Sequence, residues 1–426
     1  MNILIKGAEV LQRENGAYRT KCADIAIEGD RILAVGDIPE SFTAERVINA
    51  SGKLATPALI NCHTHAYMGI FRNLADDLTF EDWLFGSIMP REDRMTNDQA
   101  KVGVMLSLVE MMKSGCGTYL DMQMFPGTSC EAAVETGMRA VISRGLASEM
   151  GEPDGGAERR FREALWEIKN YGSYKNLSFM IGPHAIYTCG EKTLRYAAEL
   201  ANKLSIGINI HLSETKTEFN ECMEKHGMTP TKYCDSLGLL SEKTVAAHCV
   251  QLTNADIDIL AERKVNVATC PISNMKLGNG FAPVEKFYEK GINVVLGTDS
   301  SASNNTVNLF PDMRAFALVH KGKSNDVLSV PASKVIDAVT VNAAKALSLE
   351  NGEITAGKLA DIALFDLSNP TFRPKNNLAS ALAYSANGSE VSHLMVGGKF
   401  LVENGEVLTA DCEKIYYEAE KVIESL

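Results

Sequence analysis

Histidines gather at the ends of short apolar segments in this sequence. Five of the eight histidines stand at or just beyond such an end: His63, His65, His184, His211 and His248. His63 and His65, in the run NCHTH, are two residues apart, so on an extended backbone both rings point the same way and can reach one ion. A metal site with nitrogen and oxygen ligands requires such a gathering, which chance placement would rarely give. The pattern predicts a metal centre.

Two carboxyl groups occupy comparable positions. Asp299, in LGTDSSASNN, could bind the metal through one oxygen and accept a proton from a water through the other, although alone it could equally cap the next helix. Glu214 follows His211 by three residues and could carry a proton to a substrate, or be a solvated loop carboxylate. His248 could polarise the attacking water, or be a histidine of the core. Together these groups predict acid–base chemistry beside the metal.

These residues need elements that bring them to one place, and the middle of the chain has a repeating pattern that does so. Short buried apolar segments alternate there with longer helical ones, which is typical of βα units and a parallel sheet. Eight segments are predicted strands: residues 57–63, 117–122, 139–146, 177–184, 206–212, 244–249, 266–271 and 293–299. Eight strands close a (β/α)8 TIM barrel, whose catalytic groups sit at the C-terminal ends of the strands. We therefore predict a metal-dependent catalytic barrel over residues 56–351.

Both ends of the chain have a different pattern of apolar and polar residues from the middle. Residues 1–55 and 352–426 contain short pieces of alternating apolar and polar residues, separated by Gly, Asp and Asn turn signals. Strands this short need partners to bury one face. We expect the two ends to combine into one small β-sandwich domain beside the barrel.

Composition narrows the classes of partner. The formal net charge of -12 argues against binding to nucleic acid or to an anionic membrane. The sequence has no uncharged apolar run of about 18 residues, the length that a membrane-spanning helix needs. The ten cysteines are scattered without a C-x-x-C pair, which is typical of buried thiols in a reducing compartment. We expect a cytoplasmic protein that acts on a small neutral or cationic molecule. A homo-oligomer is also expected, although composition does not show the oligomeric state.

Several motifs occur in one order along the chain: PALINCHTHAYM, GPHAIYTC, HLSET, AAHC, CPISNMKLGNGFAPV and GTDSSASNN. In this order they resemble the amidohydrolase superfamily, and specifically its branch of methylthioadenosine/S-adenosylhomocysteine deaminases and related chlorohydrolases. The resemblance implies metal ligands His63, His65, His211 and Asp299, with Glu214, His248 and Asp299 as the catalytic proton-transfer groups. It implies one zinc ion per subunit, because strand 4 ends in His184 where binuclear relatives have a bridging lysine. Iron or manganese would suit the same donors.

The resemblance also implies a substrate, an adenosine-type nucleoside such as 5′-methylthioadenosine, S-adenosylhomocysteine or another 5′-modified adenosine. Hydrolytic deamination would give the inosine analogue and ammonia. Glu110 would bind the ribose hydroxyls, and Arg144, His184 and Glu214 would contact the rest of the substrate. The plain alternatives for Glu110 and Arg144 are a charge on a helix face and a surface ion pair.

One position departs from the family pattern. Ala157 stands where the family often has a further arginine after a Gly-Gly pair, so Arg159 or Arg160 would have to replace it. A substrate carboxylate needs cationic partners. The departure therefore favours methylthioadenosine or another 5′-modified adenosine over S-adenosylhomocysteine.

Alternative functions stay open. The chain could deaminate a free ring such as guanine, 8-oxoguanine, a pterin or cytosine, or act as a triazine-type chlorohydrolase, although Glu110 with Arg144 favours a nucleoside. The chain could also be an inactive barrel that serves as a binding protein. Loss of a metal-binding residue or of Glu214 would support that alternative, and the sequence keeps all of them. Residues 67–95 form a long segment that could be a lid or an interface, or its aromatics Phe80, Trp83 and Phe85 could pack in the core.

Overall fold

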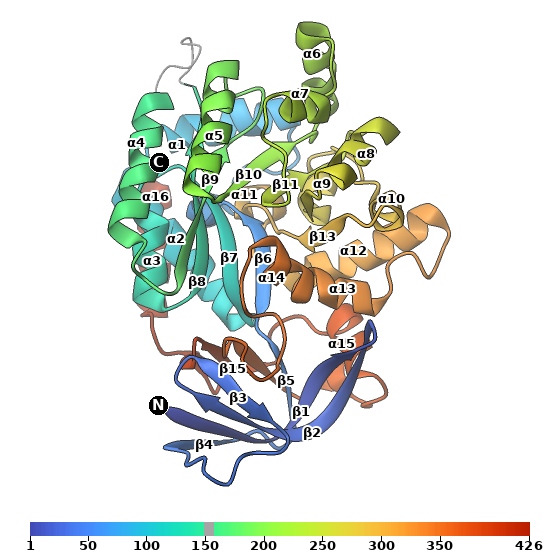
Figure 1. The fold of residues 1–426 in the computed structure, drawn as a ribbon. Coiled ribbons are helices and arrows are strands. Elements are labelled where there is room, and N and C mark those ends of the chain that lie inside the picture. The colour runs from blue at the N-terminus through green and yellow to red at the C-terminus, as the bar shows by residue number, and fades with distance from the viewer. Residues whose placement is uncertain (149–156) are drawn as a thin grey trace.

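The computed structural model describes residues 1–148 and 157–426 of the chain (Figure 1). An eight-stranded parallel barrel with its helices forms the upper part of Figure 1, and a nine-stranded sheet forms the lower part. Strands from the blue N-terminal segment and from the orange-red C-terminal segment pair in that lower sheet. The two-part architecture predicted from the sequence is confirmed.

The barrel strands follow one another in chain order around the sheet. They are β6 (Leu59–Thr64), β7 (Cys116–Gln123), β8 (Arg139–Leu146), β9 (Leu177–Pro183), β10 (Gly207–Leu212), β11 (Thr244–His248), β12 (Asn266–Thr269) and β13 (Asn293–Leu296). Every residue of β11 and β12 is buried, as expected for parallel strands that are covered on both faces. First and last strands meet where the N–H of Asp299 donates to the carbonyl of His63 at 3.0 Å. All eight predicted strands are present.

Helices follow most of the strands and cover the barrel. Their bounds are α2 (Asn97–Lys113), α3 (Thr128–Thr136), α4 (Ala157–Tyr171), α5 (Glu191–Leu204), α6 (Lys216–His226), α7 (Pro230–Ser236), α8 (Asn254–Glu262), α9 (Pro271–Lys276), α10 (Val284–Glu289), α11 (Ser301–Asn304), α12 (Leu309–Ser324), α13 (Ala332–Ala338) and α14 (Val341–Ala346). Helix α5 buries Leu194, Ala197, Ala198 and Ala201, the i, i+3, i+4 and i+7 positions of one face. No helix among the described residues is long and apolar enough to cross a membrane.

The lower sheet is built from both ends of the chain. Its N-terminal strands are β1 (Asn2–Glu14), β2 (Ala17–Glu28), β3 (Arg31–Val35), β4 (Arg46–Asn49) and β5 (Lys53–Pro57), and its C-terminal strands are β14 (Ile362–Asp366), β15 (Val391–Val396), β16 (Lys399–Glu403) and β17 (Glu406–Val407). The two groups are connected where β5 pairs antiparallel with β14. Strand β1 of the long β1–β2 hairpin pairs with β4 along its first half and with β5 along its second. Helices η3 (Pro370–Phe372), α15 (Leu378–Tyr384) and α16 (Cys412–Ser425) complete the C-terminal segment.

A buried ion pair joins the sheet to the barrel. Arg139, the first residue of β8, donates Nε to Asp361 at 2.8 Å and Nη2 to its other oxygen at 3.0 Å. Asp361 also accepts hydrogen bonds from Asn351 Nδ2 at 2.8 Å and from the N–H of Gly397 at 2.7 Å. Four donors therefore satisfy this buried carboxylate, as burial of a charge requires.

The segment after β6 covers part of the barrel mouth. It contains η1 (Ala66–Phe71), the π-helix η2 (Asp82–Ile88) and α1 (Met89–Glu92). The indole N–H of Trp83 donates to the carbonyl of Ala302, and the ring of Phe80 contacts the rings of Trp83 and Tyr187. Phe85 is exposed. Of the two roles expected for these aromatics, Trp83 and Phe80 pack inward while Phe85 faces solvent.

Candidate active site

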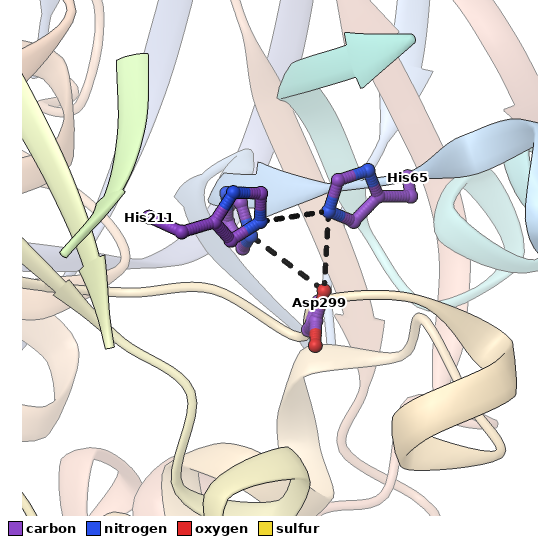
Figure 2. A group of neighbouring side chains, drawn as sticks. His65, His211 and Asp299 are labelled. Atoms are coloured by element: carbon purple, nitrogen blue, oxygen red, sulfur yellow. Dashed lines mark hydrogen bonds and ion pairs between the residues drawn. The ribbon is translucent and has the colours of Figure 1, made fainter. Parts of the chain in front are cut away.

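Four side chains meet at the C-terminal end of the barrel. His63 and His65 come from the end of β6, His211 from β10, and Asp299 from the residues that follow β13; Figure 2 shows His65, His211 and Asp299 pointing toward one another. Their possible ligand atoms all lie within 4.8 Å of one another, and all four residues are buried. The predicted metal ligands therefore form one cluster.

The ring nitrogens of this cluster are arranged for a cation. His65 donates Nδ1–H to the carbonyl of Met122 at 2.8 Å, and His211 donates Nδ1–H to the carbonyl of His184 at 2.7 Å. Each ring thus keeps a lone pair on Nε2, and the two Nε2 atoms face each other at 3.1 Å. Lone pairs at this distance repel unless a cation lies between them. The geometry fits a metal ion.

His63 strengthens this conclusion. It is fully buried, and neither of its ring nitrogens has a hydrogen-bond partner among the described residues. Burial lowers the pKa of His63 to about 4, so the ring is neutral and can act as a ligand. Its Nε2 lies 3.6 Å from Asp299 Oδ1, and His65 Nε2 lies 3.5 Å from the same oxygen. Tetrahedral zinc with ligands at about 2.0–2.2 Å separates its ligand atoms by roughly 3.3–3.6 Å, so the donor set fits zinc.

Asp299 uses its two oxygens differently. Oδ1 faces the imidazole nitrogens, whereas Oδ2 accepts hydrogen bonds from the hydroxyls of Ser273 at 2.7 Å and Ser303 at 2.6 Å. The two serines come from α9 and α11, on either side of β13. They fix the plane of the carboxylate, so Oδ1 stays directed at the metal position.

Glu214 and His248 lie next to each other beside the cluster. Glu214 Oε2 is 3.8 Å from His248 Nε2, and Glu214 Oε1 accepts a hydrogen bond from Asn279 Nδ2 at 2.9 Å. Burial, together with the charge of Asp299, raises the pKa of Glu214 well above its ordinary value. A carboxyl with a raised pKa holds its proton more firmly than a free one and can donate it to a bound molecule. His248 bonds through Nδ1 to Asn274 Oδ1 at 2.8 Å, so its Nε2 faces Glu214.

Four orienting residues were missed by the sequence reasoning: Ser273, Asn274, Asn279 and Ser303. All four lie in the two segments that follow β12 and β13, CPISNMKLGNG and GTDSSASNN. Those segments carried the family resemblance, but polar side chains in a loop have no spacing rule that says which group each one contacts.

Of the three further residues predicted to contact a substrate, one lies at the cluster. The rings of His184 and His211 are 4.6 Å apart, and burial lowers the pKa of His184 to about 3. Arg144 is buried and paired with Glu163, at 2.8 Å from Nη2 and 3.0 Å from Nε. Glu110 contacts Arg72 and the hydroxyl of Thr306 and lines a surface groove of about 480 Å³ against helix α16.

A carboxyl that the sequence reasoning did not single out lies beside the cluster instead. Glu92 ends helix α1, and its side chain lies near the hydroxyl of Tyr67, whose ring is 6.4 Å from that of His65. Burial raises the pKa of Glu92 to about 7, against the opposing charge of Arg160. The charge of Arg160 also lowers the pKa of His184, so Arg160 lies in the region of both Glu92 and His184.

Of the two arginines weighed against Ala157, Arg160 is the one that faces this region. Its Nη1 donates to the carbonyl of Gly145 at 3.1 Å, and its buried Nε has no partner among the described residues. Arg159 pairs with Glu163 on the exposed side of α4. The Gly-Gly pair before Ala157 lies outside the described residues.

Comparison with known proteins gives one consistent result. Residues 54–401 match the family model described as the amidohydrolase family. A 5-methylthioadenosine/S-adenosylhomocysteine deaminase from Caldanaerobacter subterraneus subsp. tengcongensis is 44% identical over 428 residues, 100% of this chain and 99% of that protein. A 5′-deoxyadenosine deaminase from Methanocaldococcus jannaschii is 40% identical over 410 residues, 95% of this chain and 97% of that protein. The solved structure of an adenosine deaminase from Xanthomonas campestris with bound zinc has a TM-score of 0.94 at 28% identity, covering 99% of this chain and 98% of that one.

Proposed function

The chain belongs to the amidohydrolase family, and from that membership and the geometry of the site we propose that it is a zinc-dependent hydrolytic deaminase of 5′-modified adenosines. The observation that carries the reaction is the buried Glu214, whose pKa is raised by burial, beside His248 and the four-ligand cluster. Support for the substrate class comes from relatives named for 5-methylthioadenosine, S-adenosylhomocysteine and 5′-deoxyadenosine, which match over almost the whole chain.

His63, His65, His211 and Asp299 would hold one zinc ion per subunit. Zinc bound there supplies a Lewis acid that lowers the pKa of a water to about 7, so that a nucleophile exists at neutral pH. Glu214 donates its proton to the ring nitrogen next to the amino-bearing carbon, which makes that carbon more electrophilic. Asp299 accepts one proton of the attacking water and passes it to the amino group, which leaves as ammonia, while His248 orients the water. The remaining hydroxyl proton returns to Glu214 as the carbonyl of the product forms.

For the nucleoside, we propose two carboxylates on opposite sides of the substrate. Glu214 forms a hydrogen bond with the base. Glu92 accepts hydrogen bonds from the ribose hydroxyls, since the carboxyl of Glu92 and the side chain of Tyr67 both lie beside the cluster. Glu110, expected in this role from the sequence, is engaged by Arg72 and Thr306. His184 contacts the substrate next to His211. Arg144 supports the neighbouring end of strand β8 through its ion pair with Glu163.

The 5′ substituent would lie toward Arg160. The Nε of Arg160 is a buried donor without a partner among the described residues, so it can donate a hydrogen bond to an anionic or polar 5′ group. Ala157 provides no second cation there. We propose that uncharged 5′ groups, as in methylthioadenosine, are preferred and that a carboxylate is tolerated through Arg160.

We also propose that the protein works in the cytoplasm as a homo-oligomer. All ten cysteines are free and eight of them are buried, which suits a reducing compartment. Val327 and Leu328 are 75% and 74% exposed in one loop, and exposed apolar side chains next to each other are typical of contact surfaces. Light scattering coupled to gel filtration would measure the oligomeric state.

Ammonia release tests the function. Zinc-loaded protein is assayed on methylthioadenosine, S-adenosylhomocysteine, adenosine, 5′-deoxyadenosine, guanine, 8-oxoguanine, a pterin and cytosine, and again after removal of zinc by a chelator. We expect turnover of the nucleosides, loss on chelation, recovery with zinc, and loss in Glu214→Gln, whose side chain cannot give up a proton. Activity on a free base alone would keep the metal chemistry and reject the nucleoside.

A further inference from the structure

The turn that carries Glu214 has a strained backbone that its surroundings must hold. Ser213 has φ of 53°, in the left-handed region that a residue other than glycine seldom adopts. On one side, its carbonyl accepts the N–H groups of Val250 at 3.0 Å and Gln251 at 2.7 Å, which follow strand β11. Backbone strain of this kind persists only where neighbouring groups over-determine the conformation.

Glu218 holds the turn from the other side. It lies in the first turn of helix α6, is 3% exposed, and its own N–H bonds to the hydroxyl of Thr215 at 3.0 Å. Its Oε1 accepts the N–H of Ser213 at 3.1 Å, and its Oε2 accepts the N–H of Glu214 at 2.6 Å. Each oxygen of one carboxylate therefore fixes one peptide of the turn, through charge-assisted hydrogen bonds.

We propose that Glu218 is a positioning residue for the deamination, which acts by fixing the direction of the Glu214 side chain. The proposal rests on the proposed function, in which Glu214 donates the proton to the substrate ring. Glu214 reaches Asn279 Nδ2 at 2.9 Å and lies 3.8 Å from His248 Nε2. A rotation of the peptide between Ser213 and Glu214 would carry the carboxyl away from both groups.

A purely structural role for Glu218 predicts a different result. Loss of its carboxylate would leave buried N–H groups without acceptors, which lowers stability wherever it occurs. Loss of position, by contrast, lowers the rate of the chemical step while leaving the ground-state contacts with the substrate in place. Measurement of kcat, KM and thermal stability on the same variants separates the two roles.

The first variant is Glu218→Gln, whose amide offers one oxygen and one NH2 group in place of two acceptors. Glu167→Gln is the matched control. Glu167 is also a buried glutamate, 1% exposed, but its bonds from Gln123 Nε2 at 2.6 Å and from the N–H of Gly127 at 2.7 Å both end on Oε1, so glutamine can keep them. We expect Glu218→Gln to lose about 10- to 100-fold in kcat with KM within about threefold of wild type, and Glu167→Gln to keep its kcat.

A double-mutant cycle tests whether the effect passes through Glu214. In the Glu214→Gln background, Glu218→Gln should cause little further loss of the residual rate, because the group that it positions no longer donates a proton. An equal loss in both backgrounds would overturn the proposal, and so would a lowered melting temperature with unchanged kcat. Zinc content, measured by atomic absorption, should stay at the wild-type value.

Glu218→Asp is the second variant, for use where Glu218→Gln does not fold. It keeps the charge but is one methylene shorter, so it should lower kcat more than it changes KM; an unchanged kcat would overturn the proposal. If the proposed function is wrong, the wild-type protein itself will not release ammonia from the nucleosides. If only the role of Glu218 is wrong, the wild type will be active and the Glu218 variants will keep its kcat. If the wild type deaminates a free base instead, the same variants measured on that base decide the role of Glu218.

Discussion

Replacement of Glu167 by glutamine should stabilise the protein at alkaline pH. Burial raises the pKa of Glu167 from 4.5 to about 7, although the N–H of Gly127 and the charge of Arg144 oppose the shift. At about 1.4 kcal/mol for each pKa unit, this difference corresponds to about 3 kcal/mol. Because the folded-state pKa lies above the unfolded one, the folded chain holds more protons between pH 4.5 and about 7, and its free energy of unfolding falls as pH rises through that window.

Glutamine carries no charge at any of these pH values and keeps both hydrogen bonds of Oε1. We therefore expect Glu167→Gln to match the wild type near pH 4.5 and to exceed its free energy of unfolding by up to about 3 kcal/mol at pH 8. Urea unfolding of both proteins at the two pH values measures this difference, and effects of pH on the rest of the molecule cancel. Glu158→Gln, with a side chain that is 89% exposed, is the control and should show no such dependence. A Glu167→Gln protein that is less stable than wild type at pH 8 would refute the reasoning.

Two further substitutions test the second layer of the site and the domain junction. Ser303→Ala removes one of the two hydroxyls that bond to Asp299 Oδ2, while Ser273 keeps the other; kcat should fall about tenfold with zinc content retained, and an unchanged kcat would show that one serine suffices. Asp361→Asn breaks the buried pair with Arg139 and should lower the free energy of unfolding by about 3–5 kcal/mol, measured by urea unfolding, with kcat at 25 °C retained; a stability equal to wild type would contradict the role given to this pair.

The barrel and the rim that holds the metal centre could be predicted from spacing, whereas the choice of the four ligands came from the family resemblance. Buried parallel strands read as short apolar runs, and their C-terminal ends must share one rim, so His63, His211 and Asp299 could be placed together without coordinates. The composite sheet could be predicted for a similar reason, since the short alternating strands at each end of the chain needed partners.

The residues expected or proposed to contact the substrate follow no such spacing rule. Glu110 was correctly placed on a helix before β7, but its contact with Arg72 depends on how the segment after β6 folds back. Glu92 ends the short helix α1, which directly follows a π-helix that a pattern with a period of 3.6 residues does not predict. The carboxylate of Glu218 could be recognised as part of a helix start, yet only coordinates show that it bonds to the peptides of Ser213 and Glu214.

The pairing of β5 with β14 has a consequence for how the chain is made. A ribosome releases β5 before the barrel and β14 after it, so β5 emerges with an open edge that has no partner until the barrel has been synthesised. The same delay applies to the metal centre, because His63 and His65 leave the ribosome long before Asp299. A nascent chain therefore can neither complete its sheet nor complete its metal site early, and a chain that stops before Asp299 should expose both defects together and be a substrate for proteolysis.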